Sequence, residues 1–497
     1  MTASPGRSLR IAILAMGGEG GGVLADWLVD MAEHAGWHAQ TTSVPGVAQR
    51  TGATIYYVEI LPDPAPGRLP VLALMPFPGD VDVVIASELM EAGRAVQRGL
   101  VTPDRTTFIA SSHRVYSMTE KTAMGDGRVD AGKLLDACRA SAKTWICADF
   151  AEAAERAGSV VSSALLGALA GSKALPWSVD AYRETIRRGG VGVDTSLAAF
   201  EAGLKLAVTP ASPAAPVSDG PKPGPRLQAL AQRVARDFPQ EVRPTLDAGI
   251  VRLADYQDID YAADYLDRLA ALAKQLSASS SLDPRLFETT ARHLALWMSY
   301  EDTIRVADLK TRRSRFARVS REVRLRDGQV LGVSEFMHPR VEEVADTLPA
   351  GLGRWLLGTP WARSLAGRFF GHGRVVRTSS LRGYLQLYAV AALRPMRRRT
   401  LRFVEETRRI DAWLTRIAEV AARDLDLAIA IAECQRLVKG YGDTHARGLA
   451  NFETVMSAAL RLQGRPGAGA AVRELLEAAL ADERGDKLGE AKARLAA

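Results

Sequence analysis

The chain has 497 residues, of which 47% are hydrophobic and 24% are charged, and its formal net charge is +7. This composition is typical of soluble globular domains and argues against extensive disorder. The longest weakly polar stretches, Val160–Ala170 and Tyr384–Leu393, are shorter than the roughly 20 residues that a membrane span needs. The N-terminal sequence also lacks an apolar signal core, so we expect a cytoplasmic protein without a membrane segment.

The first part of the chain, residues 1–208, alternates between short apolar runs and helical patterns. Such alternation predicts an open, Rossmann-like, mostly parallel sheet with helices on both faces. The predicted strands are Arg10–Ala15, His38–Val44, Ala53–Ile60, Val81–Ala86, Thr107–Ala110 and Thr144–Ala148. The predicted helices are Val23–His34, Glu88–Val96, Ala131–Ala142, Phe150–Ala157, Val161–Ala170, Val179–Arg187 and Leu197–Leu206.

A glycine-rich turn follows the first predicted strand and contains Gly17, Gly18, Gly20, Gly21 and Gly22. Glycine allows the backbone to turn tightly, and the free amide N–H groups at the start of a helix favour an anion. The turn is therefore a candidate site for a phosphate or carboxylate group. The alternative is that the glycines only allow the strand and the helix to pack closely.

The turn differs from two common nucleotide-binding motifs. A Walker loop needs lysine followed by serine or threonine, whereas Gly22 is followed by Val23. Gly20 and Gly22 fit a permissive dinucleotide fingerprint, but no acidic residue occurs between Glu33 and Glu59 to bind a ribose. An ordinary NAD site is therefore disfavoured.

Residues 209–226 are rich in proline and small polar residues, which predicts a semi-extended linker. The remaining residues, 227–497, show apolar residues three and four apart, which predicts a mainly α-helical domain. The predicted helices there are Leu227–Phe238, Tyr256–Leu276, Pro284–Lys310, Val341–Ala345, Arg382–Ala392, Leu401–Ala422, Asp424–Gly440, Asn451–Leu462 and Ala470–Ala481.

Cysteine and histidine are arranged unfavourably for metal binding. Cys138, Cys147 and Cys434 are the only cysteines and include no C-x-x-C pair, so this chain alone cannot supply four cysteines to an iron–sulfur cluster. The histidines are scattered without the spacing of metal ligands. We expect no metal site here and place any metal in a partner chain.

Positive charge is concentrated in two runs, Lys310–Arg326 and Arg394–Arg409. Such runs can bind nucleic acid, an anionic cofactor or an acidic protein, or they can be helix faces whose charges are paired with nearby acids. Only Phe316 and Phe403 interleave with them, which gives little support for base stacking. We therefore expect no nucleic-acid partner.

A second loop follows the predicted strand His38–Val44 and contains Gln49, Arg50 and Gly52. An arginine there could bind a phosphate or carboxylate through its two-pronged guanidinium group. The GG-x-G turn combined with a Q-R-x-G loop before a strand resembles the gamma domain of the 2-oxoacid:ferredoxin oxidoreductases. Ser111–Asp130 and Ile186–Gly203 look like the indolepyruvate:ferredoxin oxidoreductase beta subunits in their long form. Gly373–Phe403 and Leu437–Phe452 look like the helical C-terminal extension of that form.

The resemblance implies a subunit of a heteromeric complex. In that family the alpha partner binds thiamine diphosphate with Mg and carries the 4Fe-4S clusters. The complex decarboxylates an aryl 2-oxo acid such as indolepyruvate, as in aromatic amino acid degradation. The acyl group passes to coenzyme A and the electrons pass to ferredoxin. The resemblance also implies an α2β2 pairing, and we expect the basic runs, including Arg397–Arg399, to contact the partner subunit or an acidic ferredoxin.

The resemblance further implies a cofactor- or substrate-binding site in the first domain. It would include Gly17, Gly18, Glu19, Gly20, Gly21, Gly22, Ser43, Gln49, Arg50 and Gly52. Glu19 stands where the family usually has glutamine, and its charge would disfavour tight pyrophosphate binding. His113, in a loop after a predicted strand, is a candidate proton donor or substrate contact, or alternatively a loop-stabilising residue.

Two other interpretations remain open from the sequence. One is a free-standing Rossmann-type oxidoreductase that uses a nucleotide, and the other is a basic assembly or nucleic-acid-binding protein. In the helical part, His445 with Asp443 and Arg447 suggests a polar cluster, whereas Asp443 could also simply cap a helix.

Overall fold

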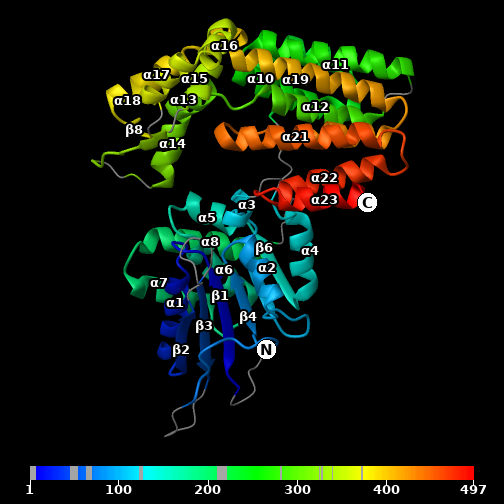
Figure 1. Cartoon of the computed structure of the whole chain (residues 1–497). Coiled ribbons are helices and arrows are strands. Elements are labelled where there is room, and N and C mark those ends of the chain that lie inside the picture. The colour runs from blue at the N-terminus through cyan, green and yellow to red at the C-terminus, as the bar shows by residue number, and fades with distance from the viewer. Residues whose placement is uncertain are drawn as a thin grey trace. The chain divides into compact units, whose positions relative to one another are not determined.

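The computed structural model describes residues 7–44, 54–62, 70–122, 127–209, 221–279, 283–323, 325, 328–337, 340–370 and 373–496. The chain divides into two compact units, Met1–Val217 and Ser218–Ala497 (Figure 1). None of the described helices is both long and apolar enough to cross a membrane.

The N-terminal unit is built on a six-stranded sheet with the strand order β2-β3-β1-β4-β5-β6. The strands β1, β4, β5 and β6 are parallel neighbours, whereas β3 runs antiparallel to β1 and β2. The bounds are β1 Leu9–Ala15, β2 His38–Val44, β3 Thr54–Leu61, β4 Val83–Ala86, β5 Thr107–Ser111 and β6 Thr144–Ala148. The predicted mostly parallel sheet is confirmed.

Helices cover both faces of this sheet. Alternate residues of β1 point to opposite faces, and both sets are apolar and buried. Ile11 and Ile13 belong to one apolar core together with residues of α1, α6 and α8. Ala12 and Leu14 belong to a second core together with residues of α2 and α4. The helices are α1 Gly21–His34, α2 Leu89–Gln97, α3 Met118–Thr122, α4 Ala131–Ser141, α5 Phe150–Arg156, α6 Val161–Ser172, α7 Val179–Gly189 and α8 Val193–Val208.

The C-terminal unit is mainly helical, as predicted. Its α-helices are α9 Gln228–Asp237, α10 Arg243–Tyr256, α11 Ile259–Ser279, α12 Pro284–Met298, α13 Thr303–Thr311, α14 Arg313–Glu322, α15 Val341–Thr347, α16 Ala350–Gly358, α17 Pro360–Phe370, α18 Leu381–Ala391, α19 Leu401–Ala421, α20 Leu425–Glu433, α21 Gly442–Leu462, α22 Ala468–Ala481 and α23 Asp486–Ala496. The 3-10 helices of the chain are Pro225–Leu227, Gln240–Val242, Arg394–Arg399 and Cys434–Leu437.

This unit differs from the sequence prediction in several places. The helices α10, α14, α16, α17 and α23 were not predicted, and α21 begins at Gly442 rather than at Asn451. The predicted helix Pro284–Lys310 is two helices, because Asp302 caps the start of α13 by accepting the amide N–H of Arg305 at 2.6 Å. A short antiparallel pair, β7 Ser334–Met337 and β8 Arg374–Arg377, was not predicted.

Candidate functional site

The glycine turn joins β1 to α1, and its backbone requires glycine at two positions. Gly18 and Gly20 have φ angles of +89° and +77°, in the left-handed region that other residues rarely adopt. A Cβ atom on Gly20 would also overlap the hydroxyl of Ser162. Gly21 lets the start of α1 approach the Tyr56 ring, since a Cβ there would lie 2.6 Å from that ring.

Glu19 folds back over the turn and binds groups at the ends of two strands. Its carboxylate accepts the amide N–H of Met16 at 3.1 Å and the hydroxyl of Ser87, which follows β4. Its other oxygen lies 3.6 Å from Nε2 of His113. Burial raises the pKa of Glu19, but the nearby His113 imidazole and the hydrogen bonds from Ser87 and Met16 outweigh that effect and leave the pKa below its ordinary value. Glu19 is therefore an anion that the protein itself places beside the glycine turn.

His113 is held through both ring nitrogens. Nδ1 lies 2.9 Å from the hydroxyl of Ser111, the last residue of β5, and Nε2 faces Glu19. The Ser111 hydroxyl also accepts the amide N–H of Ala151, and it is fully buried. The Glu19–Ser87–His113–Ser111 group, called here the carboxyl-edge cluster, thus fixes the imidazole with its side chain about one-fifth exposed (21%).

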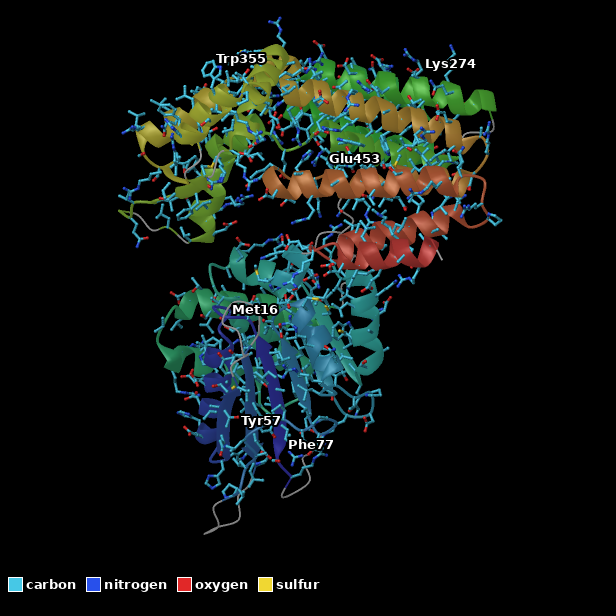
Figure 2. The ribbon with its side chains drawn as sticks, in the orientation of Figure 1. Met16, Tyr57, Phe77, Lys274, Trp355 and Glu453 are labelled. Carbon is cyan, nitrogen blue, oxygen red and sulfur yellow. The ribbon has the colours of Figure 1, made fainter. Side chains whose placement is uncertain are left out.

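The carboxyl-edge cluster lies where ligands bind in open α/β sheets. Its residues follow β1, β4 and β5, whose carboxyl ends share one edge of the sheet. Met16 lies at this end of the sheet and Phe77 near the opposite end (Figure 2). In addition, no side chain caps the start of α1 through a hydrogen bond, and the first amide N–H groups of a helix, which have no acceptor within it, favour an anion.

Glu88 stabilises the loop that carries His113. Its carboxylate accepts the amide N–H groups of Met90 at 2.9 Å and Glu91 at 2.7 Å, and so caps α2. It also accepts the amide N–H of Val115 at 3.3 Å. Burial raises the pKa of Glu88. This residue connects the start of α2 to the loop beyond β5.

Some of the predicted site residues are described by the structure and others are not. The glycines of the turn, Glu19 and His113 lie at the same edge of the sheet. Ser43 is exposed near the carboxyl end of β2, which lies at this edge too, because Tyr56 of β3 pairs with both Ser43 and Ile13 of β1. Gln49, Arg50 and Gly52 lie outside the described residues. Sequence reasoning missed Ser87, Ser111 and Ser162, although the first two sit where parallel strands end and could have been found by that rule.

The buried polar network of the C-terminal unit differs from the expected cluster of Asp443, His445 and Arg447. Asp443 pairs with Arg340, and Arg447 pairs with Glu483 at 2.8 Å. His445 instead binds Glu406, with 3.1 Å between Nε2 and the carboxylate. The three residues therefore lie on one helix but serve different contacts.

Glu406 is fully buried and is the centre of that network. It accepts the indole N–H of Trp297 at 2.7 Å, and its carboxylate lies 2.9 Å from Nε of Arg402. Burial raises the pKa of Glu406, but the hydrogen bond from His445 and the charge of Arg402 outweigh that effect and lower the pKa to about 2. Glu406 is thus held as a carboxylate inside the protein.

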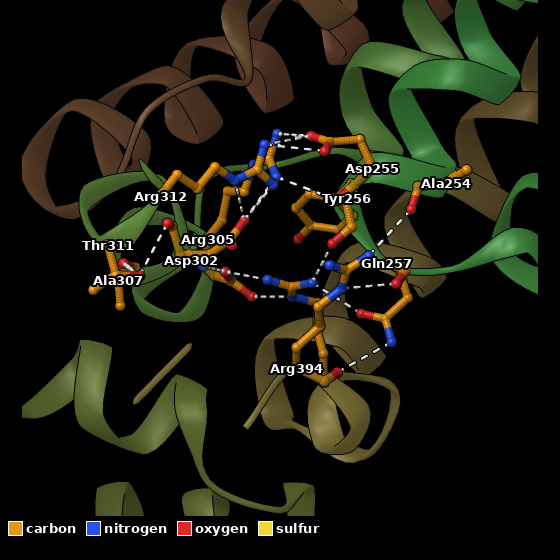
Figure 3. Close-up of polar contacts among 12 residues, drawn as sticks. Ala254, Asp255, Tyr256, Gln257, Asp302, Arg305, Ala307, Thr311, Arg312 and Arg394 are labelled. Atoms are coloured by element: carbon orange, nitrogen blue, oxygen red, sulfur yellow. Dashed lines mark hydrogen bonds and ion pairs between the residues drawn. The ribbon is translucent and has the colours of Figure 1, made fainter. Parts of the chain in front are cut away.

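The basic run Arg394–Arg409 is used largely for internal contacts, which corrects the expectation that Arg397 docks a partner. Arg397 is only 1% exposed, and it donates to Asp302 at 2.7 and 3.2 Å. It also donates to the Tyr256 carbonyl at 2.8 Å and the Gln257 side chain at 2.9 Å. Figure 3 draws these contacts as dashed lines, with Asp302 on one side of the network and Gln257 on the other.

The other basic run is also partly paired. Lys310 and Arg315 bind Glu335, and Arg312 binds Asp255 and Asp308. These contacts favour the structural interpretation of the charge over a continuous nucleic-acid surface. Among the described residues, no group of three or more histidine, cysteine, aspartate or glutamate side chains is arranged to hold a metal ion.

A glycine turn and a polar cluster lie at the carboxyl edge of a mostly parallel sheet, so the N-terminal unit is an α/β domain with a candidate ligand site. Residues 10–206, which lie within the N-terminal unit, match the family model described as pyruvate ferredoxin/flavodoxin oxidoreductase. Residues 242–458 match a family of unknown function (DUF6537). The comparison with curated proteins finds no match.

Several solved structures are similar to parts of the chain. A pyruvate oxidoreductase subunit from Thermotoga maritima is 16% identical, with 40% of this chain and 96% of that chain covered and a TM-score of 0.28. A keto/oxoacid ferredoxin oxidoreductase gamma subunit from Geobacter sulfurreducens is 15% identical, with coverages of 40% and 98% and a TM-score of 0.28. A 2-oxoglutarate:ferredoxin oxidoreductase from Magnetococcus marinus, solved with 2-oxoglutarate, coenzyme A and succinyl-CoA, is 16% identical, with coverages of 55% and 46% and a TM-score of 0.29.

Proposed function

We propose that this chain is the beta subunit of a thiamine-dependent oxidoreductase that converts an aryl 2-oxo acid, such as indolepyruvate, to its acyl-CoA and reduces ferredoxin. The observation that carries the proposal is the family match over residues 10–206. The carboxyl-edge cluster adds a candidate site within that domain, with an ionised carboxylate and an imidazole beside a helix start that no side chain caps. The aryl substrate is supported by the resemblance of the helical part to the C-terminal extension of long indolepyruvate:ferredoxin oxidoreductase beta subunits.

In this proposal the chain shapes one wall of the active site. When bound in the alpha partner, thiamine diphosphate supplies the carbanion chemistry of decarboxylation, and 4Fe-4S clusters there carry the electrons. Glu19 orients His113, and the imidazole then contacts the substrate or holds a proton beside it. The glycine turn, with Gln49 and Arg50 of the second loop, would bind an anionic group of the oxo acid or of coenzyme A.

Co-expression with an alpha subunit of this oxidoreductase class tests the proposal. We expect the two chains to purify together as an α2β2 complex that reduces methyl viologen when given indolepyruvate and coenzyme A. Phenylpyruvate, pyruvate and 2-oxoglutarate form the substrate panel, and we expect the aryl acids to react fastest. The isolated chain should be colourless and inactive.

Three results would contradict the proposal in different ways. A complex that prefers pyruvate or 2-oxoglutarate would remove the aryl specificity but retain the enzyme class. Failure of the two chains to associate would remove the subunit assignment. Tight NADH binding by the isolated chain would instead favour a free-standing nucleotide-dependent oxidoreductase.

A further inference from the structure

A large pocket lies within the C-terminal unit, whereas the carboxyl-edge cluster belongs to the N-terminal unit. Its volume is about 880 Å³, and its lining comes from α13, α15, β8, α18 and the residues next to them. Pockets that hold small organic ligands commonly measure about 300 to 1,000 Å³. The pocket is therefore large enough for a ligand of drug or lipid-fragment size.

The inner lining of the pocket is mainly apolar. Ala307 of α13 and Leu387 of α18 are almost fully buried, at 1% and 6% exposure. Further apolar lining residues are Met337, Val344, Leu348, Phe370, Val376, Val390 and Leu393. A ligand that fills this space gains stability by removing apolar surface from water.

Three exposed arginines, Arg374, Arg377 and Arg382, also line the pocket. Arg374 donates to the carbonyl of Phe369. Arg377 and Arg382 form no ion pair with any carboxylate of the described residues. Glu343 is the one acidic residue among the described lining residues, so the lining carries an excess of positive charge.

The sequence around the pocket strengthens this charge asymmetry. The segment Thr347–Val404 contains eleven arginines and no aspartate, glutamate or lysine. Many of these arginines are used within the protein: Arg363 binds Glu342, Arg397 binds Asp302, and Arg402 binds Glu406. Arg377 and Arg382 are different, since they remain available at the pocket.

Packing at the start of α18 fixes where these arginines lie. A Cβ atom on Gly383 would overlap the backbone carbonyl of Arg377, so glycine allows β8 and α18 to approach closely. Ser380 caps α18 by accepting the amide N–H of Gly383 at 3.3 Å. Arg377 and Arg382 are thereby held on the two sides of one short turn.

We propose that this pocket binds an amphipathic anion, with an apolar acyl or aryl body and a carboxylate or phosphate head. The body would pack against Ala307, Leu387 and the other apolar residues. The head would pair with Arg377 and Arg382, whose guanidinium groups suit both kinds of oxyanion. The inference goes beyond the proposed function, because it concerns the C-terminal unit and is tested by binding alone.

Isothermal titration calorimetry of the full chain with decanoyl-CoA, decanoate and coenzyme A tests the proposal. We expect saturable binding of decanoyl-CoA or decanoate at one site per chain, and binding of coenzyme A at least tenfold weaker because it lacks the apolar body. Tighter binding of decanoyl-CoA would assign the head to phosphate, and tighter binding of decanoate would assign it to carboxylate. Either ranking supports an amphipathic anion.

Variants distinguish binding in the pocket from a general attraction of anions to the positively charged segment. The double variant R377E/R382E should bind roughly tenfold more weakly or worse, because the paired charges are reversed. L387W should also weaken binding, because the larger side chain fills the apolar space. If L387W folds poorly, Q386E replaces it as a second variant of a lining residue, and it should weaken binding by placing a negative charge in the pocket. The matched control is R368E, an exposed arginine of the same segment that does not line the pocket, and its affinity should stay within about twofold.

Three outcomes would overturn the proposal. The first is that none of the probes binds. The second is that R377E/R382E and the pocket-lining variants bind as tightly as the unmodified chain. The third is that coenzyme A alone binds as tightly as decanoyl-CoA while decanoate does not bind, which would mean a site for a polar anion only.

Discussion

Replacing Glu406 with glutamine removes the charge at the centre of the buried network in the C-terminal unit. The ordinary pKa of this carboxyl is 4.5, and the folded protein lowers it to about 2. At about 1.4 kcal/mol for each pH unit, this difference corresponds to about 3 to 4 kcal/mol of stability at neutral pH. Because folding lowers the pKa, that stability is fully present above pH 4.5 and is lost as the pH falls toward 2.

We therefore expect E406Q to lower the free energy of unfolding by about 3 to 4 kcal/mol at pH 7, with a smaller effect at pH 3.5. Urea unfolding followed by tryptophan emission provides the measurement, since Trp297 donates directly to Glu406. The chain has two compact units, so the transition of the C-terminal unit must be fitted separately.

The neighbouring residue Glu405 provides a matched control. Its side chain is 32% exposed and pairs with Arg354 at 3.7 Å and Arg408 at 3.3 Å. Because partly exposed pairs contribute little, E405Q should cost less than about 1 kcal/mol. The reasoning would be refuted if E406Q were no more destabilising than E405Q, or if its effect were the same at pH 7 and pH 3.5.

Two further substitutions test the backbone and the basic run. G20A should destabilise the N-terminal unit by about 2 kcal/mol or more, because Gly20 has a left-handed backbone and an added Cβ would overlap Ser162. G17A should destabilise it much less, because a Cβ on Gly17 would meet no atom within 4 Å. Thermal unfolding of the two variants provides the comparison. R397A should lower the free energy of unfolding by about 3 to 5 kcal/mol, because it leaves the carboxylate of Asp302 without its arginine partner. Arg399 is exposed, so R399A should change the free energy of unfolding by less than about 0.5 kcal/mol. Urea unfolding measures both. Equal effects of R397A and R399A would contradict the burial argument.

Most strands of the N-terminal unit could be predicted because they are short apolar runs bounded by turn residues; β2, with the sequence HAQTTSV, is the polar exception. Ala15 is followed at once by the glycine turn, and β4 is four fully buried apolar residues. The helical character of the other unit was equally visible in its periodicity. The break between α12 and α13 was not, because one N-capping residue, Asp302, decides it within a continuous apolar pattern.

The residues of the candidate site were only partly predictable. Glu19 and His113 were identified separately, but their contact depends on sheet order, which brings the ends of β1 and β5 to the same edge with β4 between them. The burial of Arg397 could not be read from an arginine-rich run, because the run shows charge but not the partners that pair with it. A polar residue at a helix break, Asp302, turned out to be that partner.

The rate of the reconstituted complex with H113Q tests the central claim most directly, since His113 is the residue through which this chain would act on the substrate. With indolepyruvate, coenzyme A and methyl viologen, we expect H113Q to assemble normally and to lose about 100-fold or more in kcat. E19Q should assemble normally and lose less, since it only weakens the orientation of the imidazole. A complex with H113Q that turns over at the unmodified rate would contradict the account.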